Sequence, residues 1–407
     1  MIFQTTSGMN KSDSFITKEN KFKRMKKALL NFSRIFVGVL FIFSGLIKAN
    51  DPIGFGYKLQ EYFEVFHMPF LNGMATGIAI LLCVFEIVLG ALLLFGFWRK
   101  QVTAGLLVVI IFFTFLTFVS AVFKVVTSCG CFGDAIPLTP WQSFSKDLVL
   151  LAFILYLFKN RNGINPITQN KLWQNALFLI VLISSTIFSI YTYSMLPIID
   201  FLPYKVGANL PELMKIPEGA KPDEYSIIYN LKNKETGETK VMNDKDYLKT
   251  EIWKDDNWEI VGQPDSKLVK KGYQPKIKDL MINDASGTDY TKELIENPYY
   301  NLIIVAYNLN ETDEEGISKL NALALNATEQ FNIRTVLLTT NSAQEADAFS
   351  KRMKLFTEVF YADAVPLKSM VRANPGVLLL KNGTVINKWH HNNVPSFDEL
   401  SAQYFAK

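Results

Sequence analysis

Cysteine is scarce in this chain, with three residues among 407. Two of them, Cys129 and Cys131, stand one glycine apart in the stretch VVTSCGCFGDAIPLTPW. A metal site needs more ligands than this pair supplies. The net charge of +4 is also small, which removes any argument for a nucleic-acid partner. Apolar sequence is abundant instead, and it is concentrated in the first half of the chain.

Five apolar segments are long enough, or nearly so, to cross a membrane, which takes about 20 residues. Isolated helices of soluble proteins rarely stay apolar over such lengths, so membrane spans are the preferred interpretation. The predicted spans cover residues 28–47, 74–97, 102–126, 141–158 and 176–199.

Lysine and arginine gather at alternate ends of these spans. The positive-inside rule then places the N-terminus in the cytoplasm. Five spans put everything after Ile199, and the loop with Cys129 and Cys131, on the other side. We therefore predict a bacterial inner-membrane protein with a periplasmic C-terminal part, where disulfides persist. The basic residues at the predicted cytoplasmic ends are Lys18, Lys21, Lys23, Arg24, Lys26, Lys27, Arg99, Lys100, Lys159, Arg161 and Lys171.

The polar second half has the alternating patterns of strands and helices. YSIIYNLKNKETGETKVM predicts a strand, a turn and a second strand. Beyond Tyr273, strand and helix alternate before a hairpin with its turn at Asn382–Gly383, which is an α/β order. The predicted domains are a disordered tail 1–25, a four-helix bundle 26–160, a fifth transmembrane helix 172–199, a β-rich connector 200–272 and an α/β domain 273–407.

The element order of residues 273–407 resembles the thioredoxin fold. Pro375, in ANPGVLLL, sits where that family has a cis-proline before the hairpin. The resemblance implies a redox CxxC after the first central strand, but Asn308–Gly316 contains no cysteine. Because a thiolate is the nucleophile of thiol exchange, this domain alone cannot perform that chemistry. It is predicted to bind a partner or to position the membrane part.

Three motifs of the membrane half, RIFVGVLFIFSGLIKANDP, VFEIVLG and SCGCFGD…PWQSFSKDLVLL, together resemble the DoxX/MauE family of four-helix bacterial membrane proteins. DoxX relatives include the quinone-facing subunit of a thiosulfate:quinone oxidoreductase. MauE is tied to methylamine utilisation and to disulfide formation in a periplasmic dehydrogenase subunit. The resemblance implies redox chemistry at the membrane, although the family name does not by itself assign methylamine metabolism to this chain.

Cys129 and Cys131 are the predicted catalytic residues. Gly130 allows the backbone to turn tightly, and a disulfide closed over so small a ring is expected to be strained and therefore oxidising. A structural disulfide that pins the loop, or a metal site, remains an alternative. Cys83, inside the second span, is expected to be a small buried apolar residue.

Ionisable residues inside or at the edge of membrane spans are costly and tend to be functional. Arg34 and Glu86 lie within spans, whereas Lys48, Lys146 and Asp147 lie at predicted outer ends. A lysine beside a thiol lowers the pKa of that thiol, and Glu86 is a candidate proton relay to a quinone. The alternative is that these charges pair to hold the helices in register.

Two smaller features complete the prediction. The aromatic segment around Tyr57 is expected to form an amphipathic helix, which either closes the bundle or forms one wall of a lipid or quinone pocket. His390 and His391 are expected to be solvated on opposite faces of a strand.

The leading hypothesis is a protein with thiol:quinone oxidoreductase-like activity. Electrons would pass from a periplasmic thiol protein through Cys129 and Cys131 to a membrane quinone. The alternative is a non-catalytic assembly or scaffold factor whose thioredoxin-like domain binds a partner. A transporter is a third class, but the chain shows no internal repeat of the transporter kind.

Overall fold

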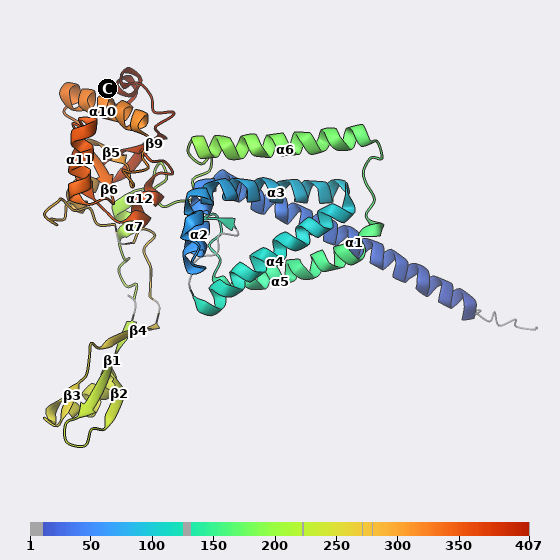
Figure 1. Ribbon diagram of the computed structural model, residues 1–407, viewed down its shortest axis with the longest axis horizontal. Helices are drawn as coiled ribbons and strands as arrows, with labels where there is room; N and C mark the ends of the chain where they lie inside the picture. Colours follow the sequence, from blue (N-terminus) through green and yellow to red (C-terminus); the bar gives the residue numbers. More distant parts are fainter. Residues whose placement is uncertain (1–10, 125–131, 222–223, 271, 279, 407) are drawn as a thin grey trace, which may run out of the picture.

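The computed structural model describes residues 11–124, 132–221, 224–270, 272–278 and 280–406. It consists of a helical membrane bundle, a C-terminal α/β domain at one end of the bundle, and a small sheet that protrudes from that domain (Figure 1). This arrangement confirms the predicted fold class.

Among the described residues, five helices are long and apolar enough to cross a membrane. Four of them pack around one apolar core, while the fifth, α6, lies along α3 at the outside and buries only Ser185, Ser189 and Thr192. These helices are α1 (Lys11–Asn50), α3 (Ala75–Phe95), α4 (Arg99–Phe123), α5 (Pro140–Lys159) and α6 (Lys171–Ser194).

Glycines bring α1 and α3 into close contact. A Cβ at Gly90 would lie 2.8 Å from the carbonyl oxygen of Gly38, a distance that no side chain tolerates. Small residues at such a crossing allow van der Waals packing between helix backbones, which is a main source of association between helices in lipid.

Helix α1 begins earlier than the sequence suggested. The tail 1–25 was expected to be disordered, yet α1 starts at Lys11 and runs without a break into the first span. The stretch KENKFKRMKK consists mainly of straight-chain residues, which lose little rotamer freedom in a helix, so the apolar span propagates backwards through it. Residues 1–10 lie outside the described part of the chain.

A short helix crosses the end of the bundle that faces the C-terminal domain. This helix, α2 (Pro52–Val65), is capped by Asp51, whose carboxylate accepts a hydrogen bond from the backbone N–H of Gly54 at 2.8 Å. The amphipathic helix expected around Tyr57 is thereby confirmed. It lies between the bundle and the α/β domain and not on a free surface (Figure 1).

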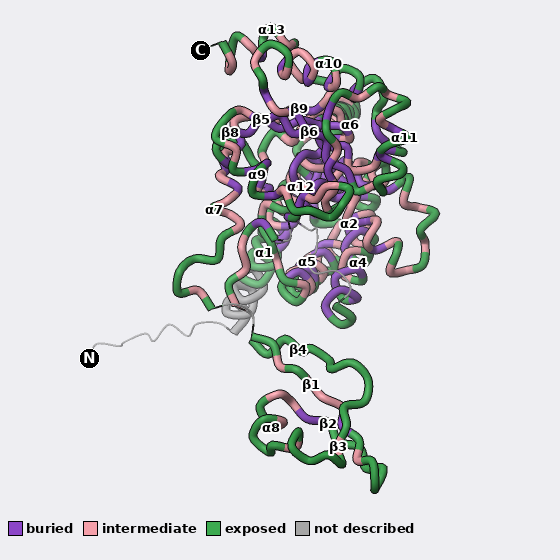
Figure 2. Tube along the Cα trace, turned by 90° about the vertical axis from the view of Figure 1, so that its left-hand side faces the viewer, coloured by how far each residue is buried: buried purple, intermediate pink, exposed green. Residues whose placement is uncertain are grey.

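The C-terminal domain has a five-stranded mixed sheet in the order β7-β6-β5-β8-β9. Strands β5, β6 and β7 are parallel, whereas β8 and β9 form the antiparallel hairpin. Apolar clusters cover both faces of this sheet, and Figure 2 shows the buried strands at the centre of the domain. The strands are β5 (Tyr300–Val305), β6 (Arg334–Thr339), β7 (Glu358–Tyr361), β8 (Gly376–Lys381) and β9 (Thr384–His390).

Helices flank this sheet where the sequence predicted them. Ser342 caps α11 and Ser396 caps α13, each in a capping box with a glutamate three residues later. The Asn374–Pro375 peptide bond is cis and directly precedes β8, the place that the thioredoxin resemblance implied. The helices are α7 (Leu210–Met214), α9 (Thr291–Ile295), α10 (Glu314–Phe331), α11 (Ala343–Met353), α12 (Ala364–Met370), α13 (Phe397–Leu400) and the π-helical turn η5 (Ser401–Phe405).

In the sequence, the protruding sheet follows α7 and precedes the other helices and strands of the α/β domain. Its first two strands form the predicted hairpin, and Gly237 takes a positive φ of 71° in the turn. All residues of its last strand are exposed, and Figure 2 shows the whole sheet as largely exposed. The elements are β1 (Glu224–Asn233), β2 (Thr239–Asn243), α8 (Asp244–Lys249), β3 (Trp258–Ile260) and β4 (Asp265–Lys270).

Candidate functional site

The predicted cysteine pair lies outside the described residues, which exclude 125–131. The chain is described again from Phe132, the residue that follows Cys131. Phe132 is buried, and its ring packs against that of Phe43 in α1 at a centroid distance of 5.7 Å. The residues around Phe132 therefore show which groups lie beside the end of the cysteine segment.

All four charged residues predicted to support the cysteines line one small void next to Phe132. We call Lys48, Glu86, Lys146 and Asp147 the bundle cluster. They come from three helices, α1, α3 and α5, and the sequence alone could not show that these helices bring them together. The void has a volume of about 20 Å³, which is room for about one water molecule.

The first pair of the bundle cluster joins α1 to α3. The ammonium of Lys48 donates to the carboxylate of Glu86, and each residue is only 2% exposed. The same ammonium lies 4.5 Å from the centroid of the Phe113 ring and 5.2 Å from that of Phe55. This cation–π contact with two aromatic faces further compensates for the burial of the charge.

The second pair lies at the start of α5. Lys146 Nζ is 2.8 Å from Asp147 Oδ1, and the other carboxylate oxygen accepts a hydrogen bond from Thr117 Oγ1 at 3.0 Å. Lys146 also lies over the Phe132 ring, 4.9 Å from its centroid. This lysine therefore links the buried carboxylate to the residue directly after Cys131.

Arg34 has a different role from the bundle cluster. Its guanidinium donates to the carbonyl oxygens of Leu93 at 2.9 Å and Leu94 at 2.5 Å, at the C-terminal end of α3. It also donates to the carbonyl of Asn165 in the connection between α5 and α6. Arg34 thus satisfies helix-end carbonyls, which is a structural function.

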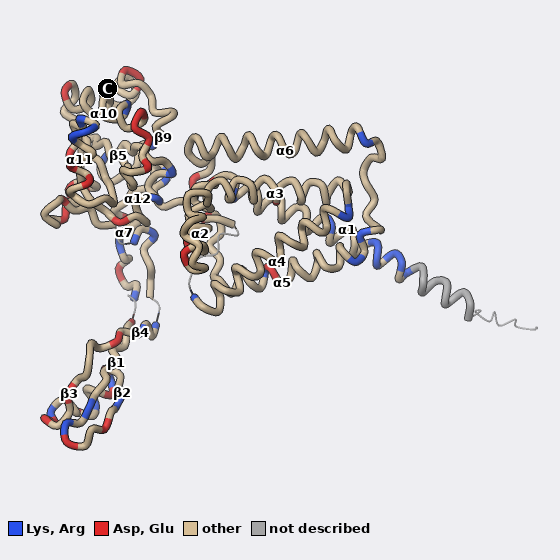
Figure 3. Tube along the Cα trace, in the orientation of Figure 1, with Lys and Arg blue, Asp and Glu red and all other residues tan. Residues whose placement is uncertain are grey.

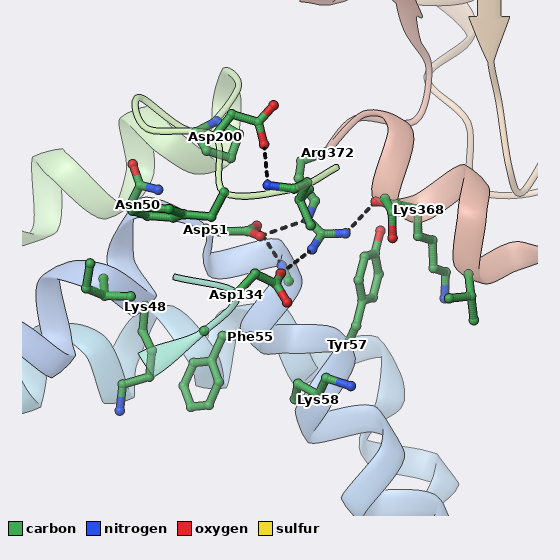
Figure 4. Close-up of a pocket in the computed structure, with 18 of the residues that line it drawn as sticks. Lys48, Asn50, Asp51, Phe55, Tyr57, Lys58, Asp134, Asp200, Lys368 and Arg372 are labelled. Carbon is green, nitrogen blue, oxygen red and sulfur yellow. Dashed lines mark hydrogen bonds and ion pairs between the residues drawn. The ribbon is translucent and has the colours of Figure 1, made fainter. Parts of the chain in front are cut away.

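A second charged site, which the sequence analysis missed, joins the bundle to the C-terminal domain. We call Arg372, Asp51 and Asp134 the interface cluster. Arg372 Nε donates to Asp51 Oδ2 at 2.8 Å, and Arg372 Nη2 donates to Asp134 Oδ2 at 3.1 Å (Figure 4). The third donor group, Nη1, bonds the carbonyl oxygen of Lys368 at the end of α12.

In the interface cluster, burial and the neighbouring charges have opposite effects on the pKa values. Arg372 is 6% exposed, and although burial disfavours its charge, Asp51 and Asp134 raise the pKa of the guanidinium above its ordinary value. Burial raises the pKa of Asp134, and the positive charge of Arg372 offsets only part of that effect. One cation thus holds two carboxylates that come from separate segments of the bundle.

Further contacts fix the same interface. The hydroxyl of Tyr57 in α2 donates to that of Tyr307 at 2.8 Å, and Lys368 lies 4.3 Å from the centroid of the Tyr57 ring. Burial raises the pKa of Tyr57 and lowers that of Lys368. Lys388 pairs with Asp200 at 2.5 Å, and burial lowers the pKa of this lysine. The C-terminal domain is therefore seated on the bundle through polar groups.

A cavity of about 390 Å³ lies between the bundle and the C-terminal domain, which we call the interface cavity (Figure 4). Its walls are α2, the segment after α6, the turn of Gly133 and Asp134, and α12 of the C-terminal domain. Lys48 lines both this cavity and the small void of the bundle cluster. The lining is mixed, with apolar residues such as Phe55 beside charged ones such as Lys58.

The structure corrects the expectation for the two histidines. His390 is 5% exposed at the end of β9, and His391 bonds the carbonyl oxygen of Pro375 at 2.8 Å and packs over Gly316. The expectation of solvated histidines was wrong because β9 ends here and the chain turns inward beside the cis-proline. Within the described ranges, no group of three or more His, Cys, Asp or Glu side chains is arranged to hold a metal ion.

Cys83 is fully buried in α3 and is not part of a disulfide. It packs with apolar neighbours such as Ala79 and Ile87, which confirms the expectation of a small buried apolar residue.

Comparison with known proteins identifies relatives of part of the chain. Residues 26–159 match the family described as "Methylamine utilisation protein MauE". Protein TlpB of Flavobacterium psychrophilum is 30% identical over 142 residues, which are 33% of this chain and 38% of that protein. The chain thus matches less than half the length of this curated relative. The resemblance of the membrane bundle to the MauE family is confirmed.

Proposed function

We propose that this chain is a membrane protein of thiol–disulfide redox chemistry, with Cys129 and Cys131 as the reacting pair. The observation that carries the proposal is the bundle cluster, four ionisable side chains around one void beside Phe132. Three of these groups, Lys48, Glu86 and Asp147, are buried in the membrane bundle, which is costly, and the void they line also contacts Phe132, the residue after Cys131. Thiol–disulfide exchange moves protons and electrons together, so buried proton-accepting groups suit it.

The proposed reaction has two balanced steps. A dithiol of a partner protein attacks the Cys129–Cys131 disulfide, so that the partner leaves as a disulfide and the pair becomes a dithiol. The dithiol then gives two electrons and two protons to a membrane quinone, which becomes a quinol, and the disulfide forms again. Glu86 and Asp147 are the proposed proton-handling groups, and each forms an ion pair with a lysine, Lys48 or Lys146.

The quinone is a substrate of this proposed reaction and not a resident cofactor. The void of the bundle cluster, at about 20 Å³, is too small for a quinone ring. The interface cavity, at about 390 Å³, falls in the size range of small-molecule pockets, and α2 forms one of its walls. This supports the interpretation of α2 as the wall of a quinone pocket.

The proposed location is a bacterial inner membrane, with the N-terminus in the cytoplasm and the C-terminal domain in the periplasm. Figure 3 supports this orientation, because most of the bundle's Lys and Arg gather at the end away from the C-terminal domain. Two connections meet at that basic end, where Arg99 donates to the carbonyl of Asn162 at 2.8 Å. The positive-inside rule makes this end cytoplasmic.

The scaffold alternative draws on a different observation. Both carboxylates of the bundle cluster are already paired with lysines, and such pairs hold helices in register without any chemistry. In that case the C-terminal domain would bind a partner and the cysteines would be structural. Because the face around Tyr307 is seated on the bundle, a partner would have to use another face of that domain.

The deciding experiment measures the redox state of the cysteines in living cells. Cells are quenched in acid, free thiols are blocked with one maleimide, and disulfides are reduced and labelled with a heavier one for mass spectrometry. The proposal expects Cys129 and Cys131 to be oxidised in normal cells and to become dithiols when quinone synthesis is depleted. Cys83 is the internal control, because it is fully buried and should not change. A pair with the same redox state in both conditions would overturn the cycling mechanism in favour of the scaffold.

A further inference from the structure

Lys48 connects the interface cavity to the bundle cluster. Among the residues that the structure describes, it alone lines both the interface cavity and the void that Glu86 and Asp147 share. We propose that the ammonium of Lys48 donates a hydrogen bond to a carbonyl oxygen of a quinone head group in the interface cavity. The inference rests on the proposed function and deepens it, because it names the donor that recognises the quinone and links it to Glu86.

The ammonium of Lys48 has donor capacity that the described residues do not use. It carries three N–H groups, and within the described structure it forms one hydrogen bond, to the carboxylate of Glu86. Its other close contacts are the ring faces of Phe55 and Phe113, with centroids at 5.2 and 4.5 Å. A ring face attracts a cation but is a weaker hydrogen-bond acceptor than an oxygen atom. Lys48 is only 2% exposed, so bulk water has little access to the remaining N–H groups.

Two aromatic rings place this donor between the two spaces. Phe55 comes from α2 and lines the interface cavity, and Figure 4 shows the Lys48 side chain beside its ring. Phe113 comes from α4 and lines the void of the bundle cluster. The ammonium therefore lies at the boundary, where the quinone head group and the Glu86 carboxylate would share its donors.

The other cations of the interface cavity are less suited to this contact. Arg372 bonds both carboxylates of the interface cluster, and Lys58 forms an ion pair with Glu61 at 2.7 Å. Lys368 is half-buried and belongs to α12 of the C-terminal domain. A membrane quinone carries an apolar tail that stays in the lipid, so its head group is expected beside a membrane helix. Lys48 meets this condition because it lies in the last turn of α1.

A buried ammonium also favours the reduced form of the quinone. When a quinone accepts electrons, its oxygen atoms gain negative charge. A positive charge stabilises them more strongly where water is excluded, because the effective dielectric constant is low there. No proton or electron leaves Lys48 in the proposed contact, so it is a binding contact that is distinct from the proton handling proposed for Glu86 and Asp147.

The test measures quinone binding to the purified full-length protein in detergent. Decylubiquinone and a short-chain menaquinone are titrated separately by isothermal titration calorimetry, which compares benzoquinone and naphthoquinone head groups. The variant Lys48→Met/Glu86→Gln removes the donor together with its counter-charge, so that no unpaired charge of this pair is left in the bundle. Its Kd should rise about tenfold to a hundredfold, as expected for the loss of one hydrogen bond from a charged donor. Lys58→Met, in the same cavity, is the matched control and should bind like the parent protein.

Infrared spectroscopy separates direct contact from a general disturbance of the bundle. A hydrogen bond lowers the stretching frequency of a carbonyl group, so an isotope-labelled quinone bound to the parent protein should show a shifted carbonyl band. In Lys48→Met/Glu86→Gln, at saturating quinone, that band should return to its position in free quinone. The parent measurement keeps the test decisive if the variant does not fold, because an unshifted band overturns the inference by itself.

Other results also overturn the inference. They are a parent protein that binds neither quinone, a double variant that binds as tightly as the parent, an equal loss of affinity in Lys58→Met, and a carbonyl band that is the same with and without Lys48. No partner thiol is added, so the assay does not depend on the cysteines. Cysteines that ignore quinone depletion in cells would defeat the proposed function and leave this result standing. Cysteines that cycle, in a protein that binds quinone without Lys48, would defeat the inference alone.

Discussion

The membrane bundle and the C-terminal domain each hold half of what a thiol-exchange protein needs. The C-terminal domain has the strand order and the cis-proline of a thioredoxin-like domain, but Asn308–Gly316 has no cysteine. In the membrane half, the sequence has Cys129 and Cys131 shortly before Phe132, a residue that lines the same void as the bundle cluster. The comparison teaches that a fold and its usual chemistry can be separated, because chemistry depends on the side chains of the site.

The two regions also bury their charges differently. In the bundle, Lys48 and Glu86 pair between helices surrounded by apolar side chains. At the interface, Arg372 satisfies two carboxylates beside a cavity of about 390 Å³. A broken pair should therefore be most costly in the bundle, where both side chains of the Lys48–Glu86 pair are almost fully buried.

The largest effect is expected for Glu86→Gln. The variant leaves the Lys48 ammonium buried without its counter-charge, and breaking a buried ion pair in this way costs about 3–5 kcal/mol. The measurement is thermal unfolding of the detergent-solubilised protein. Glu61→Gln is the control, because its partner Lys58 is partly exposed and such pairs contribute about 0–1 kcal/mol. Equal melting temperatures for the two variants would contradict this contrast between the regions.

The next effect is a pH dependence that belongs to the C-terminal domain. Burial, with a smaller contribution from the neighbouring His391, lowers the pKa of His390 from 6.5 to about 4, while Asp313 opposes the shift. Between these values the unfolded chain binds the extra proton, so stability is full above pH 6.5 and falls as the pH drops toward 4. The lowering of the pKa from 6.5 to about 4 corresponds to at most about 3.5 kcal/mol, since one pKa unit is about 1.4 kcal/mol, and solvent screening reduces the expected loss to about 2–3 kcal/mol.

The measurement is the free energy of unfolding at several pH values for the parent and for His390→Gln. The variant should show a flatter dependence between pH 6.5 and 4. If both proteins lose the same stability over this range, the titration of His390 is not its cause.

A smaller effect is expected when Gly54, which lies against the interface cluster, is replaced by alanine. A Cβ at Gly54 would lie 2.8 Å from Arg372 Nη2 and would also collide with the carboxylate of Asp51. Gly54→Ala should therefore displace the C-terminal domain and cost about 1–3 kcal/mol, as overpacking does.

Gly77 provides the matched comparison in the bundle. It lies in α3, and a Cβ there would meet open space. Gly77→Ala should raise stability by about 0.4–1 kcal/mol, because alanine restricts the unfolded chain. The two substitutions should shift the melting temperature in opposite directions, and a shift of the same sign would disprove the tight fit at Gly54.

The smallest effect should come from an exposed pair on the C-terminal domain. Lys351 and Asp347 are 2.6 Å apart at the i and i+4 positions of α11, and both side chains are largely exposed. Asp347→Asn should change the free energy of unfolding by at most about 0.5 kcal/mol. If Asp347→Asn lost as much stability as Glu86→Gln, burial would not determine how much an ion pair contributes to stability.

Most of the fold was predictable because its signals are local. Apolar length identified the five spans. The start of α5 also rests on a local signal, because Thr139 and Gln142 form a capping box there. The alternation of strand and helix patterns and the turn at Asn382–Gly383 predicted the strands of the sheet. The start of α1 was missed because a long helix can propagate through residues that would not form one alone.

The candidate site was predictable only in part. The sequence singled out Lys48, Glu86, Lys146 and Asp147, because charges within or beside apolar spans are exceptional. It gave no signal for Arg372, since an arginine in a polar domain is ordinary and its partner Asp51 lies 321 residues away. It also misjudged His390, whose burial depends on where the neighbouring chain turns.

The sequence by itself thus determined which segments cross the membrane, which residues carry unusual charge, and that the C-terminal domain has no thiol in its expected redox segment. These properties follow from composition and period over short stretches. The tertiary structure alone decided that four ionisable side chains line one void, and that Arg372 pairs with Asp51 and Asp134 across the interface. Both depend on how helices and domains pack, which short-range patterns do not specify because the partners are far apart in the chain.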